Sequence, residues 1–414
     1  MQLSGLVKFD ESFESFSFRS KDLSGGAFRI NTKVSLSDVS IKIPQLNYSK
    51  GRDNKADLEI NMDISKNGYK IYSTSYLSEK TRIDVFLLRL NKKLQLTNFV
   101  EIKVKTFSDN NKNNDFKIKY NKEKKQTIIE GELFDAEPLL KSLYKTDDKR
   151  TFSKDFNSEI KVNFDKAITG TNDDVSNFSM IASIKKGSYN KLSLKGNFSE
   201  NEIIEMSIYQ VDENKKTLQV ISDRARPFIK NFNFIKGFED GKLEYESTIT
   251  KEVTNSNLLI TDFKVSKVPA LAQLLTLASL QGIADTLSGE GIRFESFEMK
   301  SNSKGKVMNI EDALAMGPAV SILLEGYVDK GKTVSLKGTL VPATKLNSII
   351  ASIPVVGDIL VGKKMGEGVI GVSFKMKGPP KDIKTTVNPI KTLTPRFIVR
   401  AVEKFKKKKK EEAK

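Results

Sequence analysis

The side chains best suited to chemistry in this sequence are carboxylates that occur in close pairs. Glu130 and Glu132 have the residue types of a glycosidase pair, in which one carboxyl group donates a proton and the other acts as base or nucleophile. At a spacing of two residues they share one face of a strand, for which a solvated polar face is the favoured interpretation. The carboxylates of Asp173 and Asp174 could supply oxygen ligands to a cation, but the polar sequence around them favours a loop over a metal site.

Three stretches with closely spaced glycines have the composition of a phosphate-binding loop. They are residues 237–241, 289–291 and 366–368. None is followed by Gly-Lys-Ser or Gly-Lys-Thr, and their context is strand rather than strand, loop and helix. Turns and β-bulges are therefore the favoured interpretation.

Three residue types are missing from the 414 residues: cysteine, histidine and tryptophan. Without cysteine there is no disulfide, thiolate nucleophile or cysteine-bound zinc or iron–sulfur site. Without histidine there is no Ser–His–Asp triad and no histidine general base. Only mechanisms that use carboxylates alone survive. We expect a protein that is not an enzyme and that uses no cofactor and no metal.

The chain is strongly basic, with a net charge of +17 from 69 Lys and Arg against 52 Asp and Glu. This charge favours an anionic partner, either nucleic acid or phospholipid headgroups. A composition rich in Lys, Asn and Ile, as an AT-rich coding sequence produces, is the alternative explanation. Because no RNA- or DNA-binding module is recognisable, we expect no nucleic-acid partner.

The sequence contains no run of about 18 apolar residues, so no helix within it is expected to span a membrane. Its first ten residues lack the basic and apolar regions of a signal peptide. Two interpretations follow: a cytosolic protein, or part of something longer whose export signal lies elsewhere.

The elements that must position these side chains are mainly strands, because apolar and polar residues alternate along much of the chain. The alternating apolar sets begin with Leu58, Ile60, Met62 and Ile64 and recur around residues 192–198, 243–249, 320–328, 334–340 and 370–376. A hairpin loop is expected at residues 330–332. An apolar content of only 38% favours a thin interior. The predicted fold is mainly β: an elongated, curved antiparallel sheet that forms an apolar groove, with a few short helices mostly in the C-terminal half.

The clearest helix prediction covers residues 269–287, where Leu271, Leu274, Leu275 and Ala278 have helical spacing. Gly282 is expected to break or kink this helix. Shorter helices are expected at residues 138–144 and 225–232. Further apolar faces follow at residues 346–353 and 397–405, and the second of these runs into five consecutive lysines.

The C-terminal half carries a combination of short motifs that is similar to a known family. The motifs lie at residues 269–275 (PALAQLL), 288–292 (SGEGI), 317–319 (GPA), 336–343 (LKGTLVPA), 346–348 (LNS), 353–357 (IPVVG), 366–368 (GEG), 378–379 (GP) and 387–389 (VNP). Together they resemble the C-terminal region of AsmA-like proteins, closest to the YhdP-type branch of Gram-negative bacteria. Weaker likeness extends back to about Phe134.

The resemblance implies a long β-groove protein of the bacterial envelope that moves phospholipid between the inner and outer membranes. It also implies a periplasmic location in association with the inner membrane and possibly the outer membrane. Family members carry an N-terminal anchor helix, which this sequence lacks, so an inner-membrane anchor protein is a candidate partner. The expected division is residues 1–120 and 121–267 as β-groove segments, 268–400 as the AsmA-like C-terminal region with amphipathic helices, and 401–414 as a basic tail.

The leading hypothesis is non-enzymatic transfer of phospholipid along the groove, with membrane surfaces as a second partner. The alternative is a scaffold that assists outer-membrane protein assembly, as in TamB-type proteins, because open strand edges can hold a nascent strand. Two sets of residues are the site candidates. The groove or membrane-contact candidates are Leu271, Leu274, Leu275, Ala278, Ile322, Leu324, Leu336, Leu340, Ile349, Ile350, Ile353, Val355, Val356, Phe374, Phe397 and Phe405. The basic surface candidates are Lys406, Lys407, Lys408, Lys409 and Lys410, for which a solvated, frayed tail is the competing interpretation.

Overall fold

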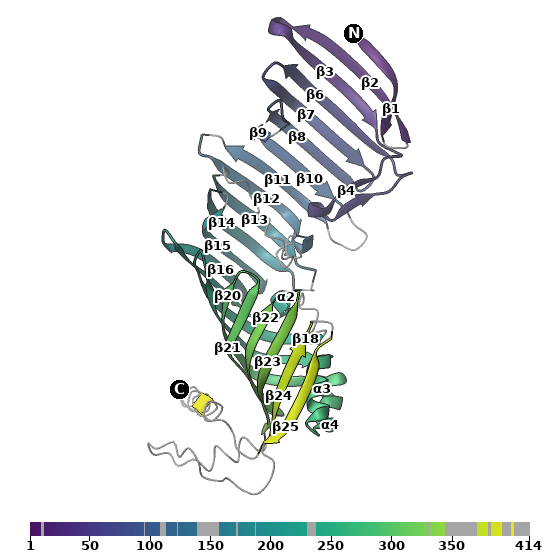
Figure 1. Cartoon of the computed structure of the whole chain (residues 1–414). Helices are drawn as coiled ribbons and strands as arrows, with labels where there is room; N and C mark the ends of the chain where they lie inside the picture. The colour runs from purple at the N-terminus through teal and green to yellow at the C-terminus, as the bar shows by residue number, and fades with distance from the viewer. Residues whose placement is uncertain are drawn as a thin grey trace. The chain divides into compact units, whose positions relative to one another are not determined.

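The fold is taken from a computed structural model of the chain (Figure 1). The structure describes residues 1–9, 12–94, 96–107, 113–121, 123–138, 157–170, 173–186, 188–229, 237–329, 331–343, 371–379, 382–390 and 399–400. The chain forms two compact units, unit 1 (Met1–Ile208) and unit 2 (Tyr209–Lys414), and each is described by itself.

Unit 1 is built on a sheet whose strands follow one another in chain order. They are β1 (Gln2–Phe9), β2 (Ser12–Leu23), β3 (Ala27–Ser35), β6 (Ala56–Ser65), β7 (Gly68–Ser78), β8 (Thr81–Leu90), β9 (Leu96–Asn98), β10 (Glu101–Thr106), β11 (Asn114–Asn121), β12 (Gln126–Asp135), β13 (Ser158–Ile168), β14 (Val175–Lys185), β15 (Ser188–Ser199) and β16 (Glu202–Asp212), which crosses the boundary between the units. Neighbouring strands pair antiparallel, and β8 pairs with both β9 and β10. The pair β12–β13 is parallel.

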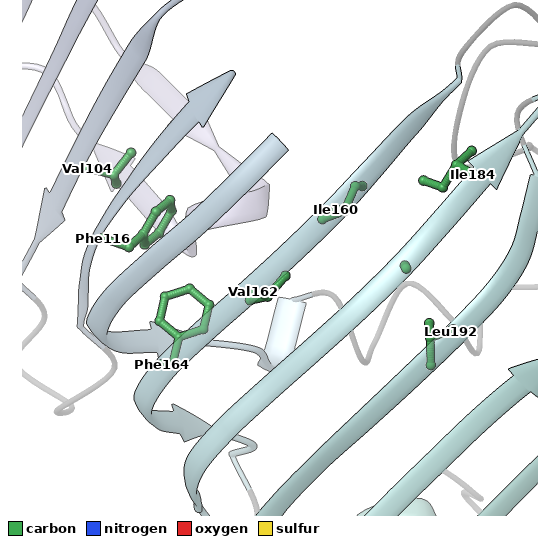
Figure 2. Packing of buried hydrophobic residues seen from close by; sticks show 8 residues of the cluster. Val104, Phe116, Ile160, Val162, Phe164, Ile184 and Leu192 are labelled. Carbon is green, nitrogen blue, oxygen red and sulfur yellow. The ribbon is translucent and has the colours of Figure 1, made fainter. Parts of the chain in front are cut away.

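The strands of unit 1 form because apolar and polar residues alternate, which places the apolar set on one face of a pleated sheet. Figure 2 shows buried members of this set projecting from β10, β11, β13, β14 and β15. Three phenylalanines give the cluster its aromatic centre. Phe134 stacks on Phe164 at a ring distance of 5.0 Å, and Phe116 meets both rings edge-on at 5.9 Å. Pairs of this geometry add to the hydrophobic gain of burial.

A small hairpin between β3 and β6 packs on the same face of the sheet. It consists of β4 (Ile41–Ile43), the 3₁₀ turn η2 (Pro44–Leu46) and β5 (Tyr48–Lys50); a second 3₁₀ turn, η1 (Ser24–Gly26), joins β2 to β3. Leu46 contacts both apolar clusters of unit 1. The Tyr48 and Tyr76 hydroxyls lie 2.7 Å apart in a buried hydrogen bond.

Unit 2 contains the strands that follow β16 and several short helices. The strands are β17 (Lys215–Ser222), β18 (Gly237–Ile249), β19 (Thr254–Ser266), β20 (Ile292–Lys304), β21 (Val307–Met316), β22 (Val320–Asp329), β23 (Thr333–Pro342), β24 (Gly371–Gly378) and β25 (Lys384–Ile390), and the helices are α2 (Arg226–Ile229), α3 (Pro269–Leu277) and α4 (Gln281–Ser288). Each strand pairs antiparallel with the next one in the chain. The β22–β23 hairpin, with Asp329 opposite Thr333, confirms the predicted turn.

The sheet of unit 2 is curved. Helix α3 follows β19 directly in the chain, yet it also contacts β25, which is six strands further along the sheet (Figure 1). Within β21–β23 both faces carry buried apolar side chains, with Leu314 and Leu323 on one face and Ile322 and Leu340 on the other. This part of unit 2 therefore has apolar packing on both sides of the sheet.

These elements confirm the predicted fold class: a mainly β chain on a curved, largely antiparallel sheet, with a few short helices that lie mostly in the C-terminal half. One helix prediction is wrong in its detail. The break within residues 269–287 lies at residues 278–280, where Ser279 has a φ of +59°, and Gly282 lies within α4. The helix predicted at 225–232 has a described length of four residues, α2.

Candidate functional site

The most extensive feature of unit 1 is a row of uncharged side chains that crosses thirteen strands from β1 to β16. The strand registers place its members directly opposite one another, and two threonines are its least apolar positions. The row consists of Leu3, Phe18, Thr32, Ile60, Thr74, Val85, Ile102, Ile118, Ile129, Val162, Met180, Leu194 and Met206. We call this row the apolar row.

A second row lies beside it on the same face. Its members are Gly5, Phe16, Val34, Leu58, Tyr76, Ile83, Val104, Phe116, Gly131, Phe164 and Phe178. Again none is charged. Two adjacent rows give a continuous apolar strip that runs perpendicular to the strands.

Accessibility varies along the apolar row in a way that matters for function. Val162 is buried, whereas Ile60, Ile102, Ile118 and Ile129 are half-buried. A half-buried isoleucine retains apolar surface in contact with water, and covering that surface is favourable at roughly 25 cal/mol per Å². The strip therefore has apolar area left to bury against a ligand.

The opposite face of the same strands is polar and ionic. The row there consists of Ser4, Ser17, Lys33, Glu59, Ser75, Asp84, Lys103, Lys117, Glu130, Asn163, Ser179, Lys195 and Glu205. Cross-strand ion pairs join its members, such as Lys117 to Glu130 at 3.1 Å. A hollow of about 710 Å³ on this face is lined by the same paired charges. The two faces thus differ sharply in chemistry.

One carboxylate of each predicted pair, Glu130 and Asp174, forms an ion pair with a neighbouring lysine. Hydrogen bonds from Lys117 and Lys119 lower the pKa of Glu130 below its ordinary range. A carboxyl group kept ionised in this way does not suit the proton-donor role of a glycosidase acid. Asp174 pairs with Lys166 at 2.8 Å and accepts a hydrogen bond from the Thr169 backbone.

Unit 2 has its own apolar rows, and they contain five of the predicted contact residues. One row consists of Val220, Tyr245, Leu258, Met299, Ala313, Leu324, Gly338, Phe374 and Val387. Its neighbour on the same face contains Leu243, Ile260, Phe297, Ala315, Ile322, Leu340 and Val372. Leu336 lies on this face too, in the row beyond Leu324.

Burial separates these five residues into two groups. Ile322, Leu340 and Phe374 are buried, so they belong to the core of unit 2 in this structure. Leu324 and Leu336 are half-buried, like the accessible members of the apolar row in unit 1. Only the second group offers surface to a ligand without a rearrangement.

The helical candidates divide in the same way. Leu274 and Leu275 are buried on the inner side of α3, while Leu271 and the C-cap residue Ala278 are half-buried. Several predicted positions lie outside the described residues: Ile349, Ile350, Ile353, Val355, Val356, Phe397, Phe405 and Lys406 to Lys410, together with most of the helix predicted at 138–144.

The sequence prediction missed the accessible residues of unit 1. Ile102 and Val104 alternate with Lys103 and Lys105, and Ile118 lies between two lysines. This lysine-flanked alternation was the available signal. Assigning these isoleucines to one shared face required the registers between β8, β10 and β11. The alternation of apolar and polar residues within each strand does not give those registers.

No helix among the described residues is long and apolar enough to cross a membrane. Comparison of the chain with protein-family models, curated proteins and solved structures found no match in any of the three.

Proposed function

We propose that this protein is a non-enzymatic carrier of phospholipid, which it binds through the acyl chains along its apolar sheet face. The observation that supports the proposal is the apolar row of unit 1, uncharged across its whole length and half-buried at most positions. Acyl chains gain roughly 0.8 kcal/mol for each CH₂ group removed from water. A strip of this kind can solvate such chains at any point along its length, while headgroups remain in water.

The wider setting of the proposal comes from the family resemblance. The motifs between residues 269 and 389 resemble AsmA-like envelope proteins, and this supports transfer between the inner and outer membranes of a Gram-negative bacterium. A periplasmic location and an inner-membrane anchor partner are part of the same proposal.

Lipid analysis by native mass spectrometry is the first test. The full chain is expressed in a Gram-negative host and purified in mild detergent. Several phospholipids per chain are expected for a conduit, and a single one indicates a shuttle. A folded chain that carries no lipid contradicts the proposal.

Photo-crosslinking locates the binding face. A benzophenone side chain is placed at Ile118 and, in a separate variant, at the adjacent Lys117, which lies on the polar face. Leu336 and Lys337 form the matched pair in unit 2, where Lys337 pairs with Glu325 at 3.0 Å. Lipid adducts are expected at Ile118 and Leu336 only. Adducts to outer-membrane proteins at the same two positions would instead support the alternative scaffold role.

A further inference from the structure

Strand β1 is paired along one of its two edges. Strand β1 pairs with β2 in a continuous register from Gln2 opposite Arg19 to Phe9 opposite Ser12, and within the described residues this is its one pairing. The Met1 nitrogen donates to Ser20 O at 2.9 Å, and the Ser20 nitrogen donates to Met1 O at 2.8 Å. Because such hydrogen-bonded pairs alternate along antiparallel strands, Gln2, Ser4, Leu6 and Lys8 direct their backbone N–H and C=O groups away from β2.

This edge lacks the features that usually prevent strand addition. The β1–β2 register has no bulge, β1 contains no proline, and Lys8 is its single charged residue. Apolar side chains are exposed on both faces, with Leu3 49% and Leu6 67% accessible. An edge with outward hydrogen-bonding groups and apolar flanks is a template for another strand.

We propose that β1 pairs antiparallel with β1 of a second copy of this chain. The strand is complementary to itself in one register. There Gln2 lies opposite Lys8 of the second copy, and Ser4 lies opposite Leu6 of the second copy. These residues carry the outward backbone groups, so the register forms about eight hydrogen bonds.

The side chains fit the same register. Leu3 lies opposite Val7 of the second copy, on the face that carries the apolar row, and Gly5 lies opposite Gly5 at the symmetry axis. The two Lys8 side chains are at opposite ends of the interface, so they do not repel each other. In a register shifted by one residue, the outward backbone groups of one copy would face residues of the other copy whose backbone groups already bond to β2. A register shifted by two residues would shorten the paired segment.

The symmetry of the pairing has a consequence for the sheet. A twofold axis through an antiparallel pair is perpendicular to the sheet, so both copies present their apolar faces on the same side. The second rows of the two copies then meet at Gly5, and the apolar row of each copy ends with Leu3 opposite Val7 of the other copy. This pairing does not depend on the proposed lipid function, although it would extend that surface.

Cysteine crosslinking tests the register, since the chain contains no cysteine of its own. Gly5→Cys places two thiols at the symmetry axis, where the Cα atoms of a non-hydrogen-bonded pair are about 4.5 Å apart, within disulfide range. A covalent dimer is expected on oxidation. Ser17→Cys on β2 is the control, because its two copies would be separated by three strand spacings, which is more than about 14 Å.

A second pair of variants covers the case in which the Gly5 substitution disturbs Phe16, whose ring lies 3.3 Å from the added Cβ. Mixing Leu3→Cys chains with Val7→Cys chains is expected to give a disulfide-linked heterodimer in excess of either homodimer. No enrichment of the heterodimer, with both variants folded, overturns the register.

Sedimentation of the full chain tests the dimer itself. Leu6→Pro removes an outward N–H while leaving the β2 bonds in place, and it is expected to weaken dimerisation about tenfold or more. Leu77→Ser, on β7 and similarly exposed, is expected to leave it unchanged. A wild-type chain that stays monomeric at every soluble concentration overturns the proposal, as does a dimer that Leu6→Pro leaves intact.

Discussion

At the scale of single residues, two leucines of α3 show how the burial of a side chain determines its contribution to the free energy of unfolding. Leu275 is fully buried, whereas Leu277 is 45% exposed two residues later. Leu275→Ala removes buried methyl groups and leaves a cavity, so we expect it to lower the free energy of unfolding by about 2–5 kcal/mol. Leu277→Ala in the same helix is expected to change it by less than about 0.5 kcal/mol. Urea unfolding of both variants checks the pair, and equal losses would contradict the placement of α3.

A second residue-scale prediction concerns acid stability. The Arg29 guanidinium donates to both carboxylate oxygens of Asp63, at 2.8 and 3.0 Å, and Tyr72 donates to one of them at 2.6 Å. The hydrogen bonds from Arg29, followed by that from Tyr72, hold the pKa of Asp63 below its ordinary value. A carboxyl group with a lowered folded-state pKa contributes stability above its unfolded pKa, and this contribution is lost as pH falls through the folded value.

Asp63→Asn should therefore destabilise the protein at neutral pH and cost progressively less as the pH falls below about 4. Unfolding free energies measured across this pH range for wild type and variant check the sign. In an Arg29→Gln background the effect of Asp63→Asn is expected to shrink, because the partner is gone. A difference that is constant with pH would show that the ion pair is not its source.

At the scale of elements, the β4–β5 hairpin depends on a buried cation. Lys50 is almost fully buried, and its Nζ donates to the carbonyl oxygens of Ser37, Val39 and Gly51 at 2.7, 2.8 and 3.0 Å. These three bonds hold the chain on both sides of the hairpin. Lys50→Met keeps the length of the side chain but leaves the carbonyl groups without this charged donor.

We expect Lys50→Met to cost about 1–3 kcal/mol, while Lys42→Met, at an exposed position of β4, changes little. The effect should be local to the hairpin. Hydrogen exchange of the Leu36 amide, which donates to Ala56 O at 2.8 Å, is expected to be faster in Lys50→Met. Unchanged exchange would mean that Lys50 does not hold the hairpin in place.

The elements also show how far sequence reasoning reaches. Alternation located strands such as β6 and β22, because a half-buried strand needs a period of two. It did not locate the helix break at Ser279, since positive φ is rare for serine and the nearby glycine was the expected breaker. Alternation also assigned Ile322, Leu340 and Phe374 to the apolar face of their strands. It did not show that they are buried in the core, because burial depends on what packs over that face. The parallel β12–β13 pair left no local signal at all.

At the scale of the whole molecule, the net charge of +17 predicts attraction to anionic membranes. The full chain is expected to bind vesicles that contain phosphatidylglycerol at low salt and to be released as salt rises, because screening shortens the range of the attraction from about 10 Å at 0.1 M to about 3 Å at 1 M. Vesicles of phosphatidylcholine alone are the control. Flotation assays measure both, and binding that is independent of salt would assign the affinity to apolar contacts instead.

The parallel pair in unit 1 has a consequence for how the chain folds. Within the described strands, β11 and β12 can zip together from their turn, where Asn121 lies opposite Gln126. Strand β13 cannot zip onto β12 in this way, since Gln126 pairs with Glu159 and the intervening segment must first be closed as a loop. Contacts between distant parts of a chain slow folding. The strands before and after this junction are therefore expected to form as two separate sets of hairpins. Their pairing at β12–β13 is expected to limit the rate at which unit 1 folds.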